Sequence, residues 1–165
     1  MIRFASLALL VLLAAPAFAQ QAAPAVPTRA DILRGEYGRY RANNDLLFYH
    51  LDIRVDPVTK TISGKNTIRF RMLADDTRIQ LDLYANLNVD RILLGSMPLK
   101  YERELNAVFV DFPATLHKGR EYAIDFYYSG APRQMGRFGG FTFGTDPSGR
   151  PCRRSTDCSG CRPRH

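Results

Sequence analysis

Residues 48–72 read FYHLDIRVDPVTKTISGKNTIRFRM, and this stretch decides the fold. Apolar and polar side chains alternate through its first part, and a period of two is typical of a half-buried strand. The apolar face of that first strand is formed by Tyr49, Leu51, Ile53 and Val55. The matching face of the second part is formed by Ile62, Gly64, Asn66, Ile68, Phe70 and Met72. We therefore expect a β-hairpin whose two strands each bury one apolar face.

The turn of this hairpin begins at Asp56 and Pro57. Proline fixes φ, and an aspartate side chain can accept hydrogen bonds from the turn that follows it. Gly64 stands inside the second strand, where glycine indicates either a bulge or a close backbone contact.

Further short alternating runs follow, with turn residues between them. They cover residues 79–83, 87–94, 97–101, 107–112 and 122–128. A slip in phase near Arg91 predicts a bulge, and Pro113 is expected to end its strand. About seven short strands without alternating helices predict an all-β fold, an antiparallel β-sandwich or saddle-like sheet.

The N-terminus has the pattern of a signal peptide over residues 1–19. Arg3 lies in a short positive region, residues 7–15 are apolar, and Ala17-Phe18-Ala19 predicts cleavage before Gln20. The alternative is a membrane anchor, for which the apolar run is short. We expect an exported protein, periplasmic or secreted.

Residues 20–44 are expected to form an Ala/Pro-rich linker and one short helix. Thr28 is placed to cap that helix, with Asp31 three positions later. The helix is expected to run to about residue 37, weakened by Gly35 and Gly38. The β domain then covers residues 45–150.

The net charge of +7 is concentrated outside the body of the chain. Residues 150–165 hold five arginines against Asp157, which is +4, and Arg3 accounts for another +1. Because a nucleic-acid-binding domain needs a basic face on its folded part, this distribution argues against nucleic acid as a partner.

All three cysteines lie in the tail, residues 151–165, which is expected to be unstructured because it lacks apolar residues. Cys152, Cys158, Cys161 and His165 form a C-x5-C-x2-C-x3-H array that would supply four zinc ligands. Two alternatives are a translated frameshift, which yields such Arg/Ser/Cys/Pro-rich sequence, and disulfide pairing that leaves one thiol over. We assign no metal ligand in this chain.

The remaining candidate residues are better explained by structure than by chemistry, so no catalytic or cofactor-binding residue is assigned. His50 is expected to be a cross-strand polar neighbour, and His117 has no partner nearby in the sequence. Asp75 and Asp76 are interpreted as an exposed turn pair. Core or cross-strand packing is expected of the tyrosines Tyr122, Tyr127 and Tyr128.

Several segments, taken in order, resemble the N-terminal domain of the aminopeptidase N family of zinc metallopeptidases. The segments that carry the resemblance are 49–56, 62–70, 81–83, 87–89, 113–122, 128–130, 139–141 and 146–151. The resemblance implies a β-saddle or sandwich that packs against a thermolysin-like catalytic domain. It stops at Pro151, where Cys152 and the arginines that follow replace the aromatic-rich continuation of the family.

In that family the catalytic domain binds zinc through H-E-x-x-H and a distal glutamate. This chain has no H-E-x-x-H and only three histidines, so the active-site residues have no counterparts here and zinc is implied only for full-length relatives. We expect a truncated, non-catalytic N-terminal domain of a secreted aminopeptidase.

A second hypothesis is a free-standing exported β-sandwich that binds a protein or peptide through a sheet face or the loop from Phe138 to Phe143. A third is a zinc-binding tail on a β-scaffold.

Overall fold

The computed structural model describes residues 26–35, 38–133, 142–145 and 149–153. The described elements are α1 (Arg29–Gly35), α2 (Arg39–Ala42), β1 (Asn44–Asp56), β2 (Thr61–Met72), β3 (Asp76–Asp82), β4 (Leu87–Leu94), β5 (Met97–Pro98), β6 (Lys100–Glu104), β7 (Ala107–Leu116), β8 (Glu121–Gly130), β9 (Phe143–Thr145) and β10 (Pro151–Arg153). The expected signal peptide lies outside these residues, as do Phe138, Phe141, Cys158, Cys161 and His165.

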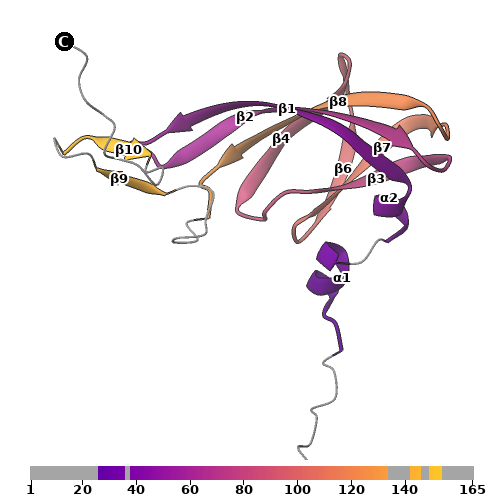
Figure 1. Ribbon diagram of the computed structural model, residues 1–165, viewed down its shortest axis with the longest axis horizontal. Coiled ribbons are helices and arrows are strands. Elements are labelled where there is room, and N and C mark those ends of the chain that lie inside the picture. The colour runs from indigo at the N-terminus through magenta and orange to yellow at the C-terminus, as the bar shows by residue number, and fades with distance from the viewer. Residues whose placement is uncertain (1–25, 36–37, 134–141, 146–148, 154–165) are drawn as a thin grey trace, which may run out of the picture.

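Two antiparallel sheets form the body of the fold, as predicted. The larger has the strand order β1-β2-β8-β4-β5 and the smaller the order β3-β7-β6. A separate two-stranded sheet pairs β9 with β10. Figure 1 shows this small sheet at one end of β1 and helix α2 at the other. The fold is therefore all-β, with side chains of the two main sheets forming one core.

The core draws on both main sheets. Its fully buried side chains include Phe70 and Met72 from β2, Ile79 from β3 and Ile124 from β8. Tyr122 and Tyr128 belong to the same cluster, which confirms the packing role expected of them. The described part of the chain holds a single cysteine, Cys152, so it contains no internal disulfide. Burial of large apolar side chains is therefore the main source of its stability.

The hairpin of residues 48–72 forms as predicted. Strands β1 and β2 pair antiparallel, and Asp56 faces Thr61 at the turn. The Asp56 carboxylate accepts hydrogen bonds from the backbone N–H groups of Val58 (2.9 Å) and Thr59 (3.1 Å). These bonds satisfy turn donors that no strand partner could reach and lower the pKa of Asp56 below its ordinary value.

Gly64 makes the close backbone contact that was one of its two predicted roles. A Cβ at this position would lie 2.2 Å from the carbonyl oxygen of Asp52 on β1. The pairing register is continuous from Asp52 to Arg54, so no bulge is present at this glycine. The absent side chain lets the two strands approach each other.

The half-burial predicted for the first strand is wrong. Residues 45–54 of β1 are all exposed, including Tyr49 (48%), Leu51 (56%) and Ile53 (39%). The buried core residues of the larger sheet come from β2, β4 and β8, and of β1 only Val55 packs against them, so most of β1 lies at an uncovered edge. The apolar face predicted for β2 is confirmed, because Ile62, Ile68, Phe70 and Met72 are buried.

Several strand boundaries also differ from the prediction. The run 97–101 divides into β5 and β6, and β6 continues to Glu104. Pro113 does not end β7, which continues to Leu116. The proline is tolerated because the register with β3 shifts between Asp76 and Arg78, opposite this part of β7. The bulge predicted near Arg91 is confirmed by a register shift there.

The N-terminal helix begins where its cap was predicted. The Asp31 N–H donates to the Thr28 hydroxyl, and the Asp31 carboxylate accepts from the Thr28 N–H at 3.1 Å. Helix α1 ends at Gly35, and a second short helix, α2, was not predicted. Within the described residues, no helix is long and apolar enough to span a membrane.

At the other end, Pro151 pairs with Thr145 in the small sheet. Residues 151–153, expected to belong to an unstructured tail, therefore form a strand, and the rest of that tail lies outside the described residues.

Candidate functional site

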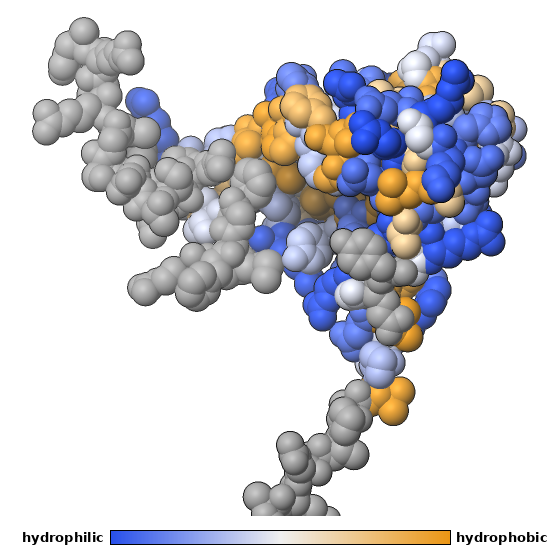
Figure 2. Space-filling view, turned by 45° about the vertical axis from the view of Figure 1, so that its right-hand side comes forward, coloured by the Kyte–Doolittle hydropathy of each residue, from blue (hydrophilic) through white to orange (hydrophobic). Residues whose placement is uncertain are grey.

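Strand β1 and strand β3 border an open cleft between the two sheets. Two hollows, of about 250 and 490 Å³, share Tyr49, Ile68, Leu81 and Asp82 as lining residues and form one continuous depression. Figure 2 shows hydrophobic residues gathered on part of one side of the molecule, with hydrophilic surface around them. The wall that β1 contributes is exposed, because the buried core residues of the larger sheet come from β2, β4 and β8.

The chemistry of the cleft is mainly that of an apolar packing surface. Tyr49 and Leu51 line it from β1, and Leu83 lines it beyond the end of β3. Desolvation in the cleft raises the pKa of the Tyr49 phenol, and the negative charge of Asp82 raises it further. Asp82 is itself held in an ion pair with Arg41 of α2.

One polar atom in the cleft lacks a partner. The side-chain oxygen of Asn66 is buried and accepts no hydrogen bond within the described part of the chain. Such an orphaned acceptor is unfavourable unless something donates to it. The sequence contained a signal for this feature, since Asn66 is the polar residue on the otherwise apolar face of β2.

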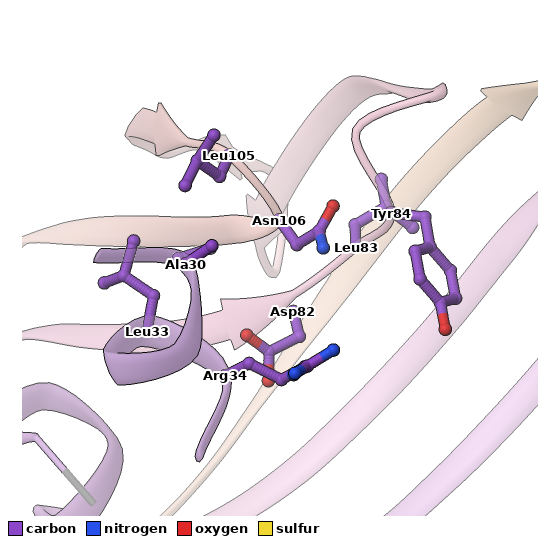
Figure 3. Close-up of a pocket in the computed structure, with 9 residues that line it drawn as sticks. Ala30, Leu33, Arg34, Asp82, Leu83, Tyr84, Leu105 and Asn106 are labelled. Atoms are coloured by element: carbon purple, nitrogen blue, oxygen red, sulfur yellow. The ribbon is translucent and has the colours of Figure 1, made fainter. Parts of the chain in front are cut away.

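A separate hollow, also of about 250 Å³, lies beneath helix α1. Figure 3 shows Ala30 and Leu33 on its helix side and Leu83 and Leu105 on its strand side. The carbonyl of Leu33 accepts hydrogen bonds from Arg41 (2.9 Å) and Gln80 (3.0 Å), which hold the helix against β3. We interpret this hollow as the seam where the helix packs on the sheet.

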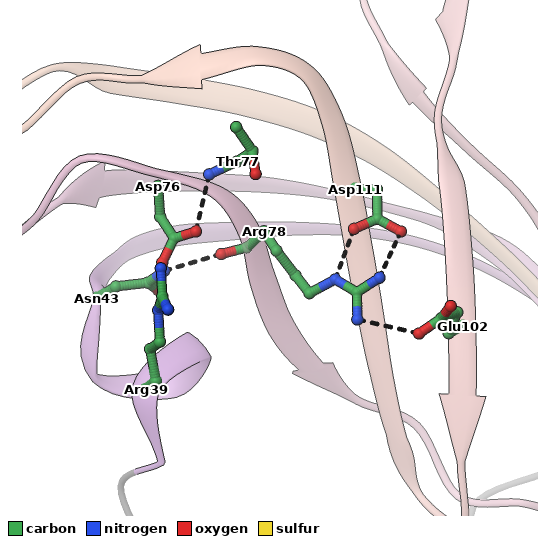
Figure 4. Close-up of polar contacts among 7 residues, drawn as sticks. All are labelled: Arg39, Asn43, Asp76, Thr77, Arg78, Glu102 and Asp111. Atoms are coloured by element: carbon green, nitrogen blue, oxygen red, sulfur yellow. Dashed lines mark hydrogen bonds and ion pairs between the residues drawn. The ribbon is translucent and has the colours of Figure 1, made fainter.

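A polar network joins the three strands of the smaller sheet. Arg78 donates to both oxygens of Asp111, at 2.5 and 2.9 Å, and to Glu102 at 2.9 Å (Figure 4). The hydrogen bond to Asp111 raises the pKa of Arg78 most, and the hydrogen bond to Glu102 raises it further. The bidentate geometry fixes the register of β3, β6 and β7, so the network has a structural role.

Replacing Arg78 with methionine is expected to destabilise the domain by about 1–2 kcal/mol, because Asp111 would keep its half-buried charge without a partner. Arg69→Met is the matched control, since Arg69 pairs with Glu121 across exposed side chains and should contribute at most about 0.5 kcal/mol. Urea unfolding of both variants measures the difference. Equal losses would contradict a special role for the Arg78 network.

The predicted turn pair Asp75 and Asp76 divides into two different environments. The Asp76 side chain is only 8% exposed and accepts a hydrogen bond from Arg39 at 3.0 Å, so its interpretation as an exposed turn residue is wrong. Desolvation raises its pKa, but hydrogen bonds from the Thr77 N–H and Arg39 outweigh this and hold the pKa below its ordinary value. Asp76 begins β3 and lies beside α2, whose Arg39 contacts its carboxylate.

A pH dependence of stability follows from Asp76. Because its folded-state pKa is below the ordinary value of 3.8, its stabilising contribution is present above that pH and is lost as the pH falls through the folded-state pKa. Asp76→Asn should therefore be less stable than the unchanged chain at pH 7, and the gap should narrow below about pH 4. Chemical unfolding between pH 7 and pH 2.5 measures it; a gap independent of pH would contradict the assignment.

Asp75 stays exposed and has a histidine partner that the sequence did not reveal. Its carboxylate lies 3.3 Å from Nδ1 of His117 and accepts the N–H of Lys118 at 2.6 Å. The Lys118 bond and then the His117 contact lower the pKa of Asp75. Both side chains are exposed, and we interpret the pair as an anchor for the loop before β8.

The other candidate residues lie apart from one another. His50 faces Thr67 across the hairpin, as expected of a cross-strand neighbour. Tyr127 stacks under the guanidinium of Arg91, 4.1 Å from the ring centre. Cys152 lies in β10, but the other members of the predicted zinc array fall outside the described residues. Among the described residues, no three His, Cys, Asp or Glu side chains gather as metal ligands would.

Neither a family model nor a curated protein matches this sequence. Solved structures do match its fold. An M1 zinc metallopeptidase variant from Deinococcus radiodurans, bound to a Tyr-Ser-Ala substrate, has 21% sequence identity and a TM-score of 0.52 over 59% of this chain and 22% of that one. A two-domain M1 zinc metallopeptidase variant bound to L-arginine has 20% identity and a TM-score of 0.52 over 67% and 28%.

The chain thus spans about a quarter of the length of the structures it matches. At this level of identity the similarity establishes a shared fold for the matched region. The N-terminal domain fold expected from the sequence resemblance is consistent with it.

Proposed function

We propose that this chain is the non-catalytic N-terminal β domain of an exported zinc aminopeptidase. The observation that carries the proposal is the fold similarity to M1 zinc metallopeptidases, which for the two-domain enzyme covers 67% of this chain and 28% of that one. The ordered segments of the sequence resemblance support the same assignment. In this proposal the domain contributes packing and positioning, whereas zinc and the hydrolytic residues belong to a catalytic domain.

The cleft beside β1 is the surface proposed to contact the catalytic domain. It is apolar, it is lined by Tyr49 and Leu51, and it holds the orphaned acceptor of Asn66. A packed neighbour would remove the apolar side chains from water and could donate to that oxygen. Exposed apolar patches of this kind are typical of surfaces that are covered in the complete assembly.

The first test concerns the DNA that encodes the chain. We expect translation beyond the codon of Arg150 to reveal, in another frame, an aromatic-rich segment followed by H-E-x-x-H. The tail with Cys152 would then be the product of a frameshift, and its zinc array would have no chemical role. If all three frames lack such a continuation, the proposal fails.

A second test uses the protein. The purified chain should not hydrolyse aminoacyl substrates; peptidase activity that a chelator abolishes would contradict a non-catalytic role. In a protein that restores the continuation, Tyr49→Ala should lower the free energy of unfolding by about 1–2 kcal/mol, because the ring would be covered. The same change in the present chain should have a smaller effect, because Tyr49 is 48% exposed. Equal effects in both proteins would place the catalytic domain elsewhere.

A binding module for an extended peptide is the second candidate function. The open edge of β1 favours it, since an edge strand can accept a further strand through its backbone. Phe143, one of the aromatic residues first considered for this role, is buried in β9 and is not available on the surface. Peptide capture by the purified chain would support this candidate over the first.

A further inference from the structure

We propose that the edge of β1 pairs with the β1 edge of a second copy of this chain, antiparallel and centred on Ile53. The inference goes beyond the proposed function, because it concerns the backbone edge near the hairpin turn and would hold whether or not a catalytic domain covers the cleft. The result would be one continuous sheet that crosses a two-fold axis.

The edge is suited to strand pairing over its second half. Within the described residues, β1 has a strand on one side only. Its register with β2 shifts between Leu46 and Phe48 but is continuous from there to Asp56. Regular edges of this kind expose a row of unpaired N–H and C=O groups, and natural edges are commonly protected by bulges or short length. Residues 48–56 have neither protection, although they carry the charged side chains Asp52 and Arg54, another common device against strand addition.

Charge complementarity selects the second copy and the register. In an antiparallel pair related by a two-fold axis, directly opposite residues share a face. A centre at Ile53 places Asp52 opposite Arg54 of the other copy, and the symmetry repeats this pair. Both side chains are exposed, and neither has a salt bridge within the described part of the chain. Centres at positions 52 or 54 would instead oppose Asp52 to itself or Arg54 to itself.

The other face of the same register is apolar. Ile53 would face its own copy, and Leu51 would face Val55 twice by symmetry. Leu51 is 56% exposed and Ile53 is 39% exposed, so pairing would remove considerable apolar surface from water. Cross-strand pairs of opposite charge and pairs of β-branched residues each stabilise antiparallel sheets. This one register therefore places opposite charges together on one face and apolar side chains together on the other.

The first experiment is sedimentation equilibrium of the purified chain over a concentration series. The unchanged chain should form dimers. Arg54→Asp should weaken the dimer about ten-fold or more, because two like-charge pairs replace two opposite-charge pairs. The double variant Asp52→Arg with Arg54→Asp should restore dimerisation, since the charges are exchanged but remain complementary. Arg120→Asp, an equal charge change on an exposed residue away from β1, is the matched control and should have no effect.

A cross-linking experiment tests the geometry directly. With the three tail cysteines replaced by serine, Ile53→Cys should form a disulfide-linked dimer, because symmetric neighbours across an antiparallel pair lie within disulfide range. Leu51→Cys should not form this disulfide. In the proposed register position 51 faces position 55 of the other copy, so the two introduced cysteines would be four residues apart along the strand. Thermal unfolding of each variant confirms that it is folded.

Three results would overturn the proposal: a chain that remains monomeric throughout the concentration range, a dimer indifferent to charge reversal at Arg54, and cross-linking through position 51 in place of 53. A monomer that captures an unrelated extended peptide on β1 would also overturn it and would favour the peptide-binding function.

Discussion

Alanine at position 64 is expected to destabilise the domain by about 3 kcal/mol, because the new Cβ would collide with backbone that cannot rotate away. The collision is with the carbonyl oxygen of Asp52 at 2.2 Å, and the carbonyl carbon and the Cα of Ile53 follow at 3.2 Å. Relief requires β1 and β2 to separate locally. Since these strands pair over residues 44–72, the whole hairpin would be strained.

Urea unfolding of Gly64→Ala measures this loss, and hydrogen exchange locates it. Amides of β1 should exchange faster than those of β8, because β1 is held by β2 alone in the five-stranded sheet. Gly35→Ala is the control: its Cβ would meet nothing within 4 Å and its backbone is helical, so stability should stay constant or rise slightly. A neutral Gly64→Ala would show that the strands are further apart than described.

Truncation of Phe70 to alanine is expected to remove about 3–5 kcal/mol, enough to unfold a domain of ordinary stability. Phe70 is 1% exposed, and its ring lies 6.3 Å from that of Phe112 and 6.0 Å from that of Tyr122. The cavity would thus open in the centre of the core, between the two sheets. Such a site cannot collapse without moving strands of both.

Leu51→Ala is the matched control on the other strand of the same hairpin. The sequence pattern treats Leu51 and Phe70 alike, as members of two apolar faces. The structure leaves Leu51 56% exposed, so its truncation should reduce the free energy of unfolding by less than about 1 kcal/mol. Denaturant unfolding of both variants at low protein concentration separates the two views. A loss of more than about 2 kcal/mol for Leu51→Ala would mean that β1 is covered in the folded chain.

Much of the fold could be predicted from the sequence, because strands and turns are specified by residues close together in the chain. The alternation in residues 61–72 predicted the buried face of β2, and Asp56 with Pro57 predicted the turn. Thr28 marked the start of α1 through its own side-chain bonds, and Arg91 marked a bulge through a change of phase. Each of these signals depends on neighbours a few residues apart.

The features of the candidate site depended on contacts between distant residues. No local pattern connects Asp75 with His117, or Arg78 with Asp111 and Glu102. The burial of Asp76 follows from the helix that supplies Arg39, and that helix was not predicted. Long-range pairs of this kind are fixed by the topology of the sheets, which periodicity does not specify.

The sequence by itself determined that this is an all-β domain, where its first hairpin turns, and which face of β2 is apolar, because a period of two and turn chemistry act on adjacent residues. Only the tertiary structure decided how wide the second sheet is. Side chains of β2, β4 and β8 form the core with those of the three-stranded sheet, whereas residues 45–54 of β1 stay exposed. The same apolar alternation therefore became core on β2 and an open edge on β1, because burial depends on what lies opposite a strand.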